Sequence, residues 1–172
     1  MAQISLQSLN TLDRAGFVAI CGRFFEHSPW IADRTWPTRP WASREALHSA
    51  LCEALSIARL DEQISLIAAH PDLVGKAAIA GQLTSESTRE QYAAGLGNLS
   101  AEEIALFQKY NNAYRDRFGF PFVICARENK KDAILQAFPI RLTHSREQEI
   151  AAAVREIEKI AKLRLFDAIS EN

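Results

Sequence analysis

The sequence predicts an all-α protein, and three observations support that class. Apolar residues recur at intervals of three and four along most of the chain, as on the buried faces of helices. Residues typical of helix caps stand at the starts of these stretches. The one apolar stretch that favours a strand, 118–126, has no second strand to pair with. We therefore expect residues 1–172 to form a single-domain compact bundle of about seven to nine helices, with one extended apolar segment at the pocket.

The first half of the chain predicts three helices. They are a helix capped by Ser8 or Asn10 and running through Phe17 to Phe24, a helix from Glu45 to Ala58 that follows Ser43, and a short helix from Asp61 that ends before Pro71. Proline disfavours helical geometry in the residue before it, which places the end of the third helix.

The second half predicts three more helices. They are a long helix that starts at the capping box Ser100-x-x-Glu103 and ends at Gly119, a brief helix from Asp132 to Phe138 that ends before Pro139, and the longest helix, from Ser145 to about Ile169.

Two stretches interrupt the helical pattern. Residues 28–41 contain three prolines and three tryptophans, and we expect a loop packed onto the core. Residues 118–126 are apolar and β-prone, so we expect a buried extended segment. Because its backbone amides have no partner strand, they should face helix ends or a ligand.

Composition and charge exclude several classes of function. The net charge is −1 with mixed signs, which argues against binding to nucleic acid or to an anionic membrane. No segment approaches the about 20 apolar residues of a membrane span, and we expect neither a signal peptide nor a peroxisomal Ser-Lys-Leu address. The widely spaced Cys21, Cys52 and Cys125 suit a reducing compartment, so we expect a cytoplasmic protein. Without metal-ligand spacings or a glycine-rich phosphate loop, we expect no metal, nucleotide or redox cofactor.

His70 is the first candidate for chemistry. It follows the helix that opens at Asp61 and precedes Pro71, so its orientation is restricted, and its imidazole can exchange protons near neutral pH. The alternative is a histidine that stabilises the carbonyl end of a helix. Spacing alone leaves both interpretations open.

Ser87, Glu90 and Gln91 form the second candidate. In a helix, positions i, i+3 and i+4 share one face, so a hydroxyl, a carboxylate and an amide would point the same way. The alternative is structural, because Ser87-x-x-Glu90 also matches a capping box.

Arg164 is the third candidate. It continues the apolar stripe of the last helix, which comprises Ile150, Ala153, Val154, Ile157, Ile160 and Ala161. The cations Arg155, Lys159 and Lys162 lie off that stripe. A buried guanidinium needs an anion, so Arg164 either pairs with an internal carboxylate or binds an anionic or carbonyl-rich ligand.

Three motifs occur in one order and spacing: His70-Pro71-Asp72-Leu73, Ser87-x-x-Glu90-Gln91-x-x-Ala94-Gly95-Leu96 and Phe118-Gly119-Phe120-Pro121-Phe122-Val123-Ile124. Together they resemble the 2-oxo-4-hydroxy-4-carboxy-5-ureidoimidazoline (OHCU) decarboxylases. Ser28-Pro29-Trp30 and Arg164-Leu165 fit the same family, so the resemblance spans nearly the whole chain.

The resemblance implies a cofactor-free, all-α homodimer that converts OHCU to (S)-allantoin, the last step of urate oxidation. It implies that His70 and Glu90 are the acid–base pair and that Arg164 binds the substrate. Other residues that it places at the pocket are Pro71, Ser87, Gln91 and the backbone of Phe122, Val123, Ile124, Cys125 and Ala126, with Ile124 in particular bonding the polar ring edge.

Two other classes remain open. In a helical binding module without catalysis, His70, Glu90 and Arg164 would be caps and an ion pair. In a metal-dependent hydrolase, His70, Asp72 and Glu90 would hold the metal.

Overall fold

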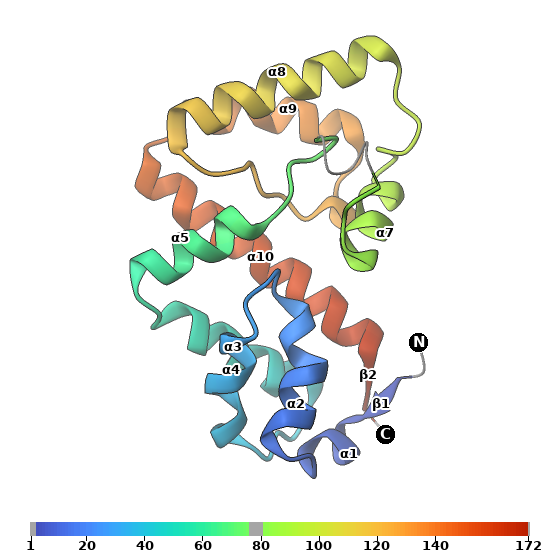
Figure 1. Cartoon of the computed structure of the whole chain (residues 1–172), viewed down its shortest axis with the longest axis vertical. Coiled ribbons are helices and arrows are strands. Elements are labelled where there is room, and N and C mark those ends of the chain that lie inside the picture. Colours follow the sequence, from blue (N-terminus) through green and yellow to red (C-terminus); the bar gives the residue numbers. More distant parts are fainter. Residues whose placement is uncertain (1–2, 76–80, 172) are drawn as a thin grey trace. The chain divides into compact units, whose positions relative to one another are not determined.

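The computed structural model describes residues 3–75 and 81–171 (Figure 1). Within these ranges the chain forms nine α-helices, three short 3-10 helices and two strands of two residues each, so the all-α class is confirmed. The chain divides into two compact units. The first unit comprises residues up to Leu66 and from Glu158 onward, and the second unit comprises Ile67–Ile157. The prediction of a single domain over 1–172 stays a prediction.

The first unit contains the N-terminal helices and the end of the chain. Its elements are β1 (Ile4–Ser5), α1 (Leu6–Asn10), α2 (Arg14–Cys21), η1 (Gly22–Phe24), α3 (Trp30–Thr35), η2 (Trp36–Thr38), α4 (Arg44–Ser56), most of α5 (Leu60–Ala69), the last part of α10 (Arg146–Ala168) and β2 (Ile169–Ser170). β1 and β2 pair in parallel, with Ile4 opposite Ile169. Its core includes the fully buried Phe17, Leu51 and Leu165.

Two predictions for the first unit need correction. The Phe17 helix is capped by Asp13, whose side chain accepts from the Gly16 N–H, and not by Ser8 or Asn10. Asn10 instead exchanges two hydrogen bonds of 3.0 Å with the backbone of Trp41. The stretch 28–41 was expected to be a loop, but it contains α3 and η2. Its packing onto the core is confirmed at Trp41, which is buried and stacks on Phe17 at 5.0 Å.

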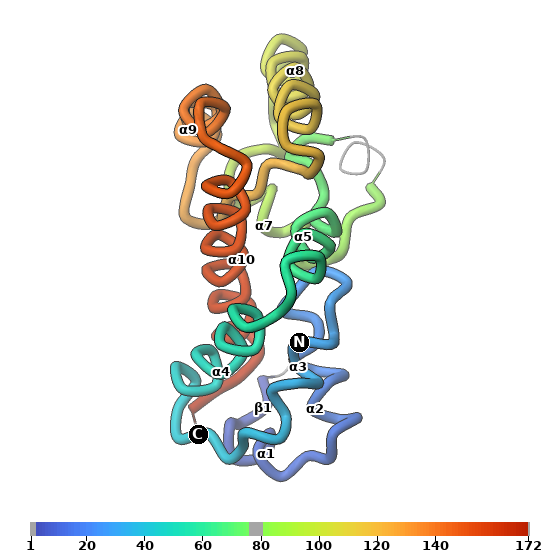
Figure 2. The backbone as a smooth tube through the Cα atoms, turned by 90° about the vertical axis from the view of Figure 1, so that its left-hand side faces the viewer, coloured from blue at the N-terminus to red at the C-terminus, as the bar shows by residue number. Residues whose placement is uncertain are grey.

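The second unit contains the later helices. Its elements are the end of α5, α7 (Ser85–Ala93), α8 (Ala101–Phe118), η3 (Ala126–Glu128), α9 (Lys131–Arg141) and the first part of α10. α8 and α9 pack against each other, and Figure 2 shows the chain passing between them through the extended segment.

The start and stop signals of α8 are confirmed. Ser100 and Glu103 form the reciprocal capping box, and Gly119 ends the helix with φ 82°, a left-handed conformation that glycine adopts at little cost. The predicted end of α9 is wrong, because Pro139 lies inside the helix. A proline inside a helix lacks the N–H donor and crowds the carbonyl four residues earlier, but here the helix continues for two residues to Arg141.

The extended segment is confirmed over residues 119–125, because Phe118 is the last residue of α8 and Ala126 begins η3. Its aromatic neighbours explain why it is buried. Phe118, Phe120 and Phe122 alternate along the chain, and their ring centroids lie 4.6, 6.1 and 5.2 Å from that of Tyr114. Phe122 also stacks on Phe138 at 3.9 Å. The segment therefore packs one face into the core of the second unit, and no described strand pairs with it.

None of the described helices combines the length and the apolar character that crossing a membrane requires.

Candidate active site

His70 lies at the end of α5, as predicted. Helix α5 ends at Ala69, and the His70 N–H donates to the Ile67 carbonyl at 3.1 Å. Only 6% of the residue is exposed. A histidine with so little access to solvent is held by its neighbours, and side chains from α7 and α8 hold the turn that follows it.

Gln91 holds this turn from α7. Its Oε1 accepts from the Val74 N–H at 3.1 Å, and its Nε2 donates to the Asp72 carbonyl at 3.5 Å. Gln91 is buried, so these hydrogen bonds are largely shielded from water. The residue predicted to line the pocket thus also joins α7 to the turn after His70.

Two side chains of α8 hold the same turn. Asn111 Nδ2 donates to the Leu73 carbonyl at 2.8 Å. Arg115 Nε contacts both carboxylate oxygens of Asp72, at 2.9 and 3.0 Å. Asn111 and Arg115 are four residues apart and share one helix face. Side chains from α7 and α8 therefore hydrogen-bond three consecutive residues of the turn, 72–74.

The turn also contains backbone strain. Val74 has φ 54°, in the left-handed region that a β-branched residue rarely adopts. Such a conformation costs about 1–3 kcal/mol and persists only where the surroundings impose it. The contacts to Asp72, Leu73 and Val74 itself provide that support, so they stabilise the turn in this conformation.

Helix α7 presents the second candidate group. Its N-cap is Thr84, which accepts from the Ser87 N–H at 3.2 Å, so the interpretation of Ser87 as a cap is wrong. Because the helix begins earlier than a Ser87 cap would require, Ser87, Glu90 and Gln91 all lie within it and share a face, as the functional interpretation predicted. Ser87 and Gln91 are buried and Glu90 is half-buried.

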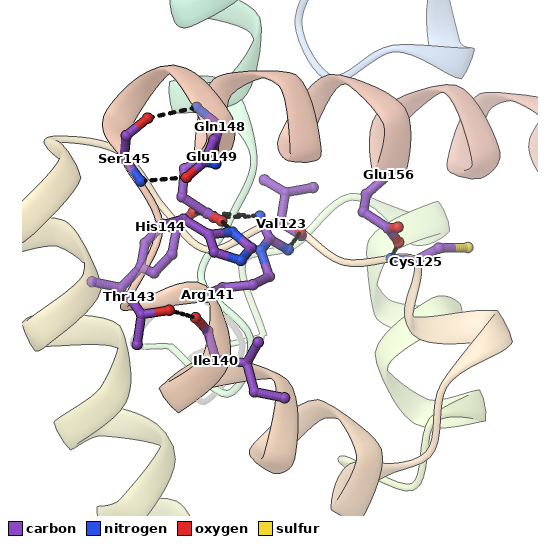
Figure 3. Close-up of polar contacts among 11 residues, drawn as sticks. Val123, Cys125, Ile140, Arg141, Thr143, His144, Ser145, Gln148, Glu149 and Glu156 are labelled. Carbon is purple, nitrogen blue, oxygen red and sulfur yellow. Dashed lines mark hydrogen bonds and ion pairs between the residues drawn. The ribbon is translucent and has the colours of Figure 1, made fainter.

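Charged side chains hold the extended segment. Arg141 Nη1 donates to the Val123 carbonyl at 2.6 Å, and the Cys125 N–H donates to Glu156 at 2.8 Å (Figure 3). We expected these amides to face helix ends or a ligand. For Cys125 the partner is a carboxylate on α10.

Helix α7 lies close to the end of this segment, and the electrostatics of the Cys125 thiol reflect that proximity. Burial raises its pKa to about 11, and the carboxylates of Glu128, Glu156 and Glu90 contribute to the rise. A thiol with a raised pKa is mostly protonated at neutral pH, which disfavours a role as nucleophile. The contribution from Glu90 places its carboxylate within electrostatic reach of the extended segment, and η3 contacts α7.

Arg164 lies in the first unit. Its predicted inward position is confirmed: only 5% of it is exposed, and Ala153, Ile157, Ile160 and Ala161 are buried on the same stripe. Its Nη2 lies 3.4 Å from Oε1 of Glu26, which is also buried. Of the two alternatives, the internal carboxylate is therefore present.

A family model for OHCU decarboxylase matches residues 10–166, nearly the whole chain. The chain belongs to the OHCU decarboxylase family.

Relatives of known name match nearly the whole of this chain. An OHCU decarboxylase of Haloferax volcanii is 39% identical over 170 residues, covering 99% of each chain. A putative human OHCU decarboxylase is 36% identical over 166 residues, covering 96% of each. A uric acid degradation bifunctional protein of Bacillus subtilis is 38% identical over 167 residues, and the match covers 33% of that protein.

Two solved structures are similar. An (S)-allantoin synthase superposes with a TM-score of 0.77 at 26% identity, covering 97% of this chain and 54%, about half, of that one. An OHCU decarboxylase structure determined in the presence of (S)-allantoin superposes with a TM-score of 0.65 at 24% identity over 80% of this chain and 89% of that one. The second match supports the fold alone.

In this member of the OHCU decarboxylase family, the second unit brings together most of the predicted site residues. His70 and Pro71 connect through the turn to Gln91, which shares α7 with Ser87 and Glu90, and Glu90 acts on Cys125 of the segment 122–126. Arg164 belongs to the first unit.

Sequence patterns missed Asn111, Arg115, Glu156 and Glu26. Asn111 is a buried polar residue on the apolar face of α8, and Glu26 follows Phe24-Phe25 in an apolar stretch, so each carried a weak signal. Neither signal names a partner, because the partner is distant in sequence.

The metal-dependent alternative has no support in the described ranges. No group of three or more His, Cys, Asp or Glu side chains there is arranged to hold a metal. Asp72 is bonded to Arg115. Cys52 Sγ lies 3.3 Å from His48 Nε2. Burial and the nearby Glu158 raise the pKa of this thiol to about 12, which disfavours the thiolate form at neutral pH.

Proposed function

We propose that this chain catalyses the cofactor-free decarboxylation of OHCU to (S)-allantoin, the last step of urate oxidation. The observation that carries the proposal is the family match over residues 10–166, supported by relatives whose names state this activity. His70 and Glu90, the proposed acid–base pair, both lie in the second unit.

The substrate itself supplies the electron sink. Its carboxylate is attached to C4, next to a ring C=N bond, so it resembles a β-imino acid. When the bond from C4 to the carboxylate breaks, its electron pair moves into the imine, carbon dioxide leaves, and an enaminol remains. The former imine nitrogen takes up a proton to give this neutral enaminol. A proton delivered to one face of C5, with loss of the proton of the 4-hydroxyl, then gives (S)-allantoin. The protein must orient the carboxylate, stabilise the enaminol and deliver that proton.

We propose the following division of work. His70 engages the 4-hydroxyl and assists the loss of the carboxylate, and Glu90 donates the proton to C5. Arg164 binds the substrate, and Pro71, Ser87 and Gln91 line the pocket. Within the backbone of Phe122, Val123, Ile124, Cys125 and Ala126, Ile124 bonds the polar ring edge. The rigid turn after His70 supports the first role, because proton transfer requires a fixed donor–acceptor geometry.

The deciding assay supplies freshly generated OHCU and follows the optical rotation of the product. We expect rapid formation of one enantiomer. A rate equal to that of the spontaneous reaction, with a racemic product, would exclude the activity.

Glu90→Gln tests the proton donor while keeping the size of the side chain. We expect the rate to fall by orders of magnitude. A loss below about tenfold, or about 1.4 kcal/mol of barrier, would remove Glu90 from that role. Glu102→Gln on the exposed start of α8 is the matched control and should leave the rate unchanged.

Assembly and location are part of the same proposal. We propose a cytoplasmic homodimer that folds as a single domain and uses no metal, nucleotide or redox cofactor. Light scattering after gel filtration measures the mass in solution, and a monomer would contradict the dimer. Full activity after exhaustive chelation is the expected outcome, and its loss would revive the metal-dependent alternative.

A further inference from the structure

Two side chains of opposite charge hold the peptide groups on either side of Ile124. Arg141 donates to the Val123 carbonyl at 2.6 Å, and Glu156 accepts from the Cys125 N–H at 2.8 Å. Figure 3 shows both contacts on the same stretch of chain, one from the end of α9 and the other from α10. All of these groups belong to the second unit.

Peptide geometry transmits both contacts to Ile124. The Val123 carbonyl and the Ile124 N–H belong to one peptide group, and the Ile124 carbonyl and the Cys125 N–H belong to the next. In a trans peptide the C=O and N–H point in opposite directions. The Ile124 N–H is therefore directed away from Arg141, and the Ile124 carbonyl is directed away from Glu156.

The Arg141 side of this arrangement is rigid. Arg141 pairs with Glu149 at 2.8 Å, and Glu149 is fully buried. Glu149 also bonds the Tyr114 hydroxyl and contacts His144 Nδ1 at 2.6 Å. A carboxylate with three partners fixes the guanidinium, and the guanidinium in turn fixes the Val123 carbonyl.

Ile124 itself is left available. Across residues 3–75 and 81–171, no hydrogen bond uses its N–H or its carbonyl. It is half-buried, between the buried Val123 and Cys125. A donor and an acceptor with imposed directions suit a cyclic amide or urea, whose edge offers a carbonyl and an N–H.

We propose that Glu156 and Arg141 are positioning residues, which orient the N–H and the carbonyl of Ile124 toward the ring edge of the substrate. This inference rests on the proposed function, in which Ile124 binds that edge. For Glu156 the role requires only a hydrogen-bond acceptor at the right reach. The negative charge of its carboxylate is not needed.

Substitutions of Glu156 separate reach from charge. Glu156→Gln keeps the reach and an acceptor oxygen but loses the charge. Glu156→Asp keeps the charge and shortens the side chain, and Glu156→Ala loses both. Arg155→Ala changes the exposed neighbour on the same helix and is the control.

Each variant is measured by calorimetric titration with (S)-allantoin and by kcat and KM. We expect Glu156→Gln and the control to stay within about twofold of wild type. Glu156→Asp and Glu156→Ala should raise Kd and KM about tenfold with kcat nearly unchanged. Contacts made equally in the ground state and the transition state affect KM alone. A loss of affinity in Glu156→Gln equal to that in Glu156→Ala would overturn the proposal. So would an unchanged Kd in both Glu156→Asp and Glu156→Ala.

Amide hydrogen exchange of Cys125, followed by NMR, provides a readout that needs no activity. Exchange should accelerate in Glu156→Asp and Glu156→Ala but not in Glu156→Gln. If the variants show this exchange pattern but the wild type does not turn over OHCU, the positioning contact stands and the proposed function is excluded. If the wild type is active but the variants do not show the pattern, the proposed function stands and the positioning contact is excluded. Should Glu156→Ala fail to fold, the comparison of Glu156→Asp with Glu156→Gln decides.

Discussion

The Gln91 side chain accepts a hydrogen bond of 3.1 Å from the Val74 N–H and so stabilises a valine with φ 54°. This contact joins the helix that carries Glu90 to the turn that follows His70. The two proposed acid–base residues are therefore connected through one buried amide, and their relative placement depends on it.

Gln91→Leu tests that dependence. The Val74 N–H loses its acceptor, so the free energy of unfolding should fall by about 1–3 kcal/mol. The rate should fall at least about tenfold, because the turn no longer fixes His70. Urea denaturation and initial rates measure the two effects. Arg89→Ala, exposed on the same helix, is the control. A destabilised variant with the wild-type rate would show that this turn does not orient His70.

Glu26→Ala tests the buried pair with Arg164. Removing the Glu26 carboxylate breaks a buried ion pair, so the free energy of unfolding should fall by about 3–5 kcal/mol. The double variant Glu26→Leu, Arg164→Met should regain most of that loss, because an apolar pair of similar volume needs no desolvation. Denaturation curves of the single and double variants provide the comparison. A double variant no more stable than the single one would contradict this account.

Tyr114→Phe tests the network around Glu149. The hydroxyl bonds Glu149 and lies 3.3 Å from Arg141 Nη2, so its removal leaves buried charged groups less satisfied. We expect a loss of about 1–3 kcal/mol in the free energy of unfolding. Tyr110→Phe makes the same chemical change in a ring that stacks on Phe138, and it should cost much less. Equal losses in the two variants would show that the hydroxyl contacts contribute nothing.

Alkaline pH should destabilise the protein. Burial raises the pKa of the Cys125 thiol to about 11 and that of Cys52 to about 12, and it also raises the pKa values of Cys21 and Tyr114. In the unfolded chain a thiol titrates near pH 8.5. Above that pH the unfolded state releases protons that the folded state retains, so the free energy of unfolding declines as pH rises from about 8.5 toward 11.

Urea midpoints between about pH 7.5 and 10.5, measured under reducing conditions, check this decline. Cys52→Ala removes one of the groups and should make the decline shallower. A midpoint that stays constant across this range would refute the assignment of buried, neutral thiols.

The sequence predicted what local rules determine. Ser43, the Ser100–Glu103 capping box and Gly119 act within one helical turn, and the structure has each where expected. The buried position of Arg164 followed from helical periodicity alone. The errors arose where a local rule had a competitor close by: Thr84 caps α7 in place of Ser87, and Pro139 is accommodated within the last turn of α9.

By itself, then, the sequence determined the all-α class, the helix faces and, through motifs in register, the family. Only the tertiary structure decided which polar groups meet. Gln91 reaches Val74 across 17 residues, and Arg164 reaches Glu26 across 138. Periodicity and capping are set by the nearest turn of backbone, so they appear in a short stretch of sequence. The partner of a buried charge is set by packing between distant helices, and no local pattern encodes it.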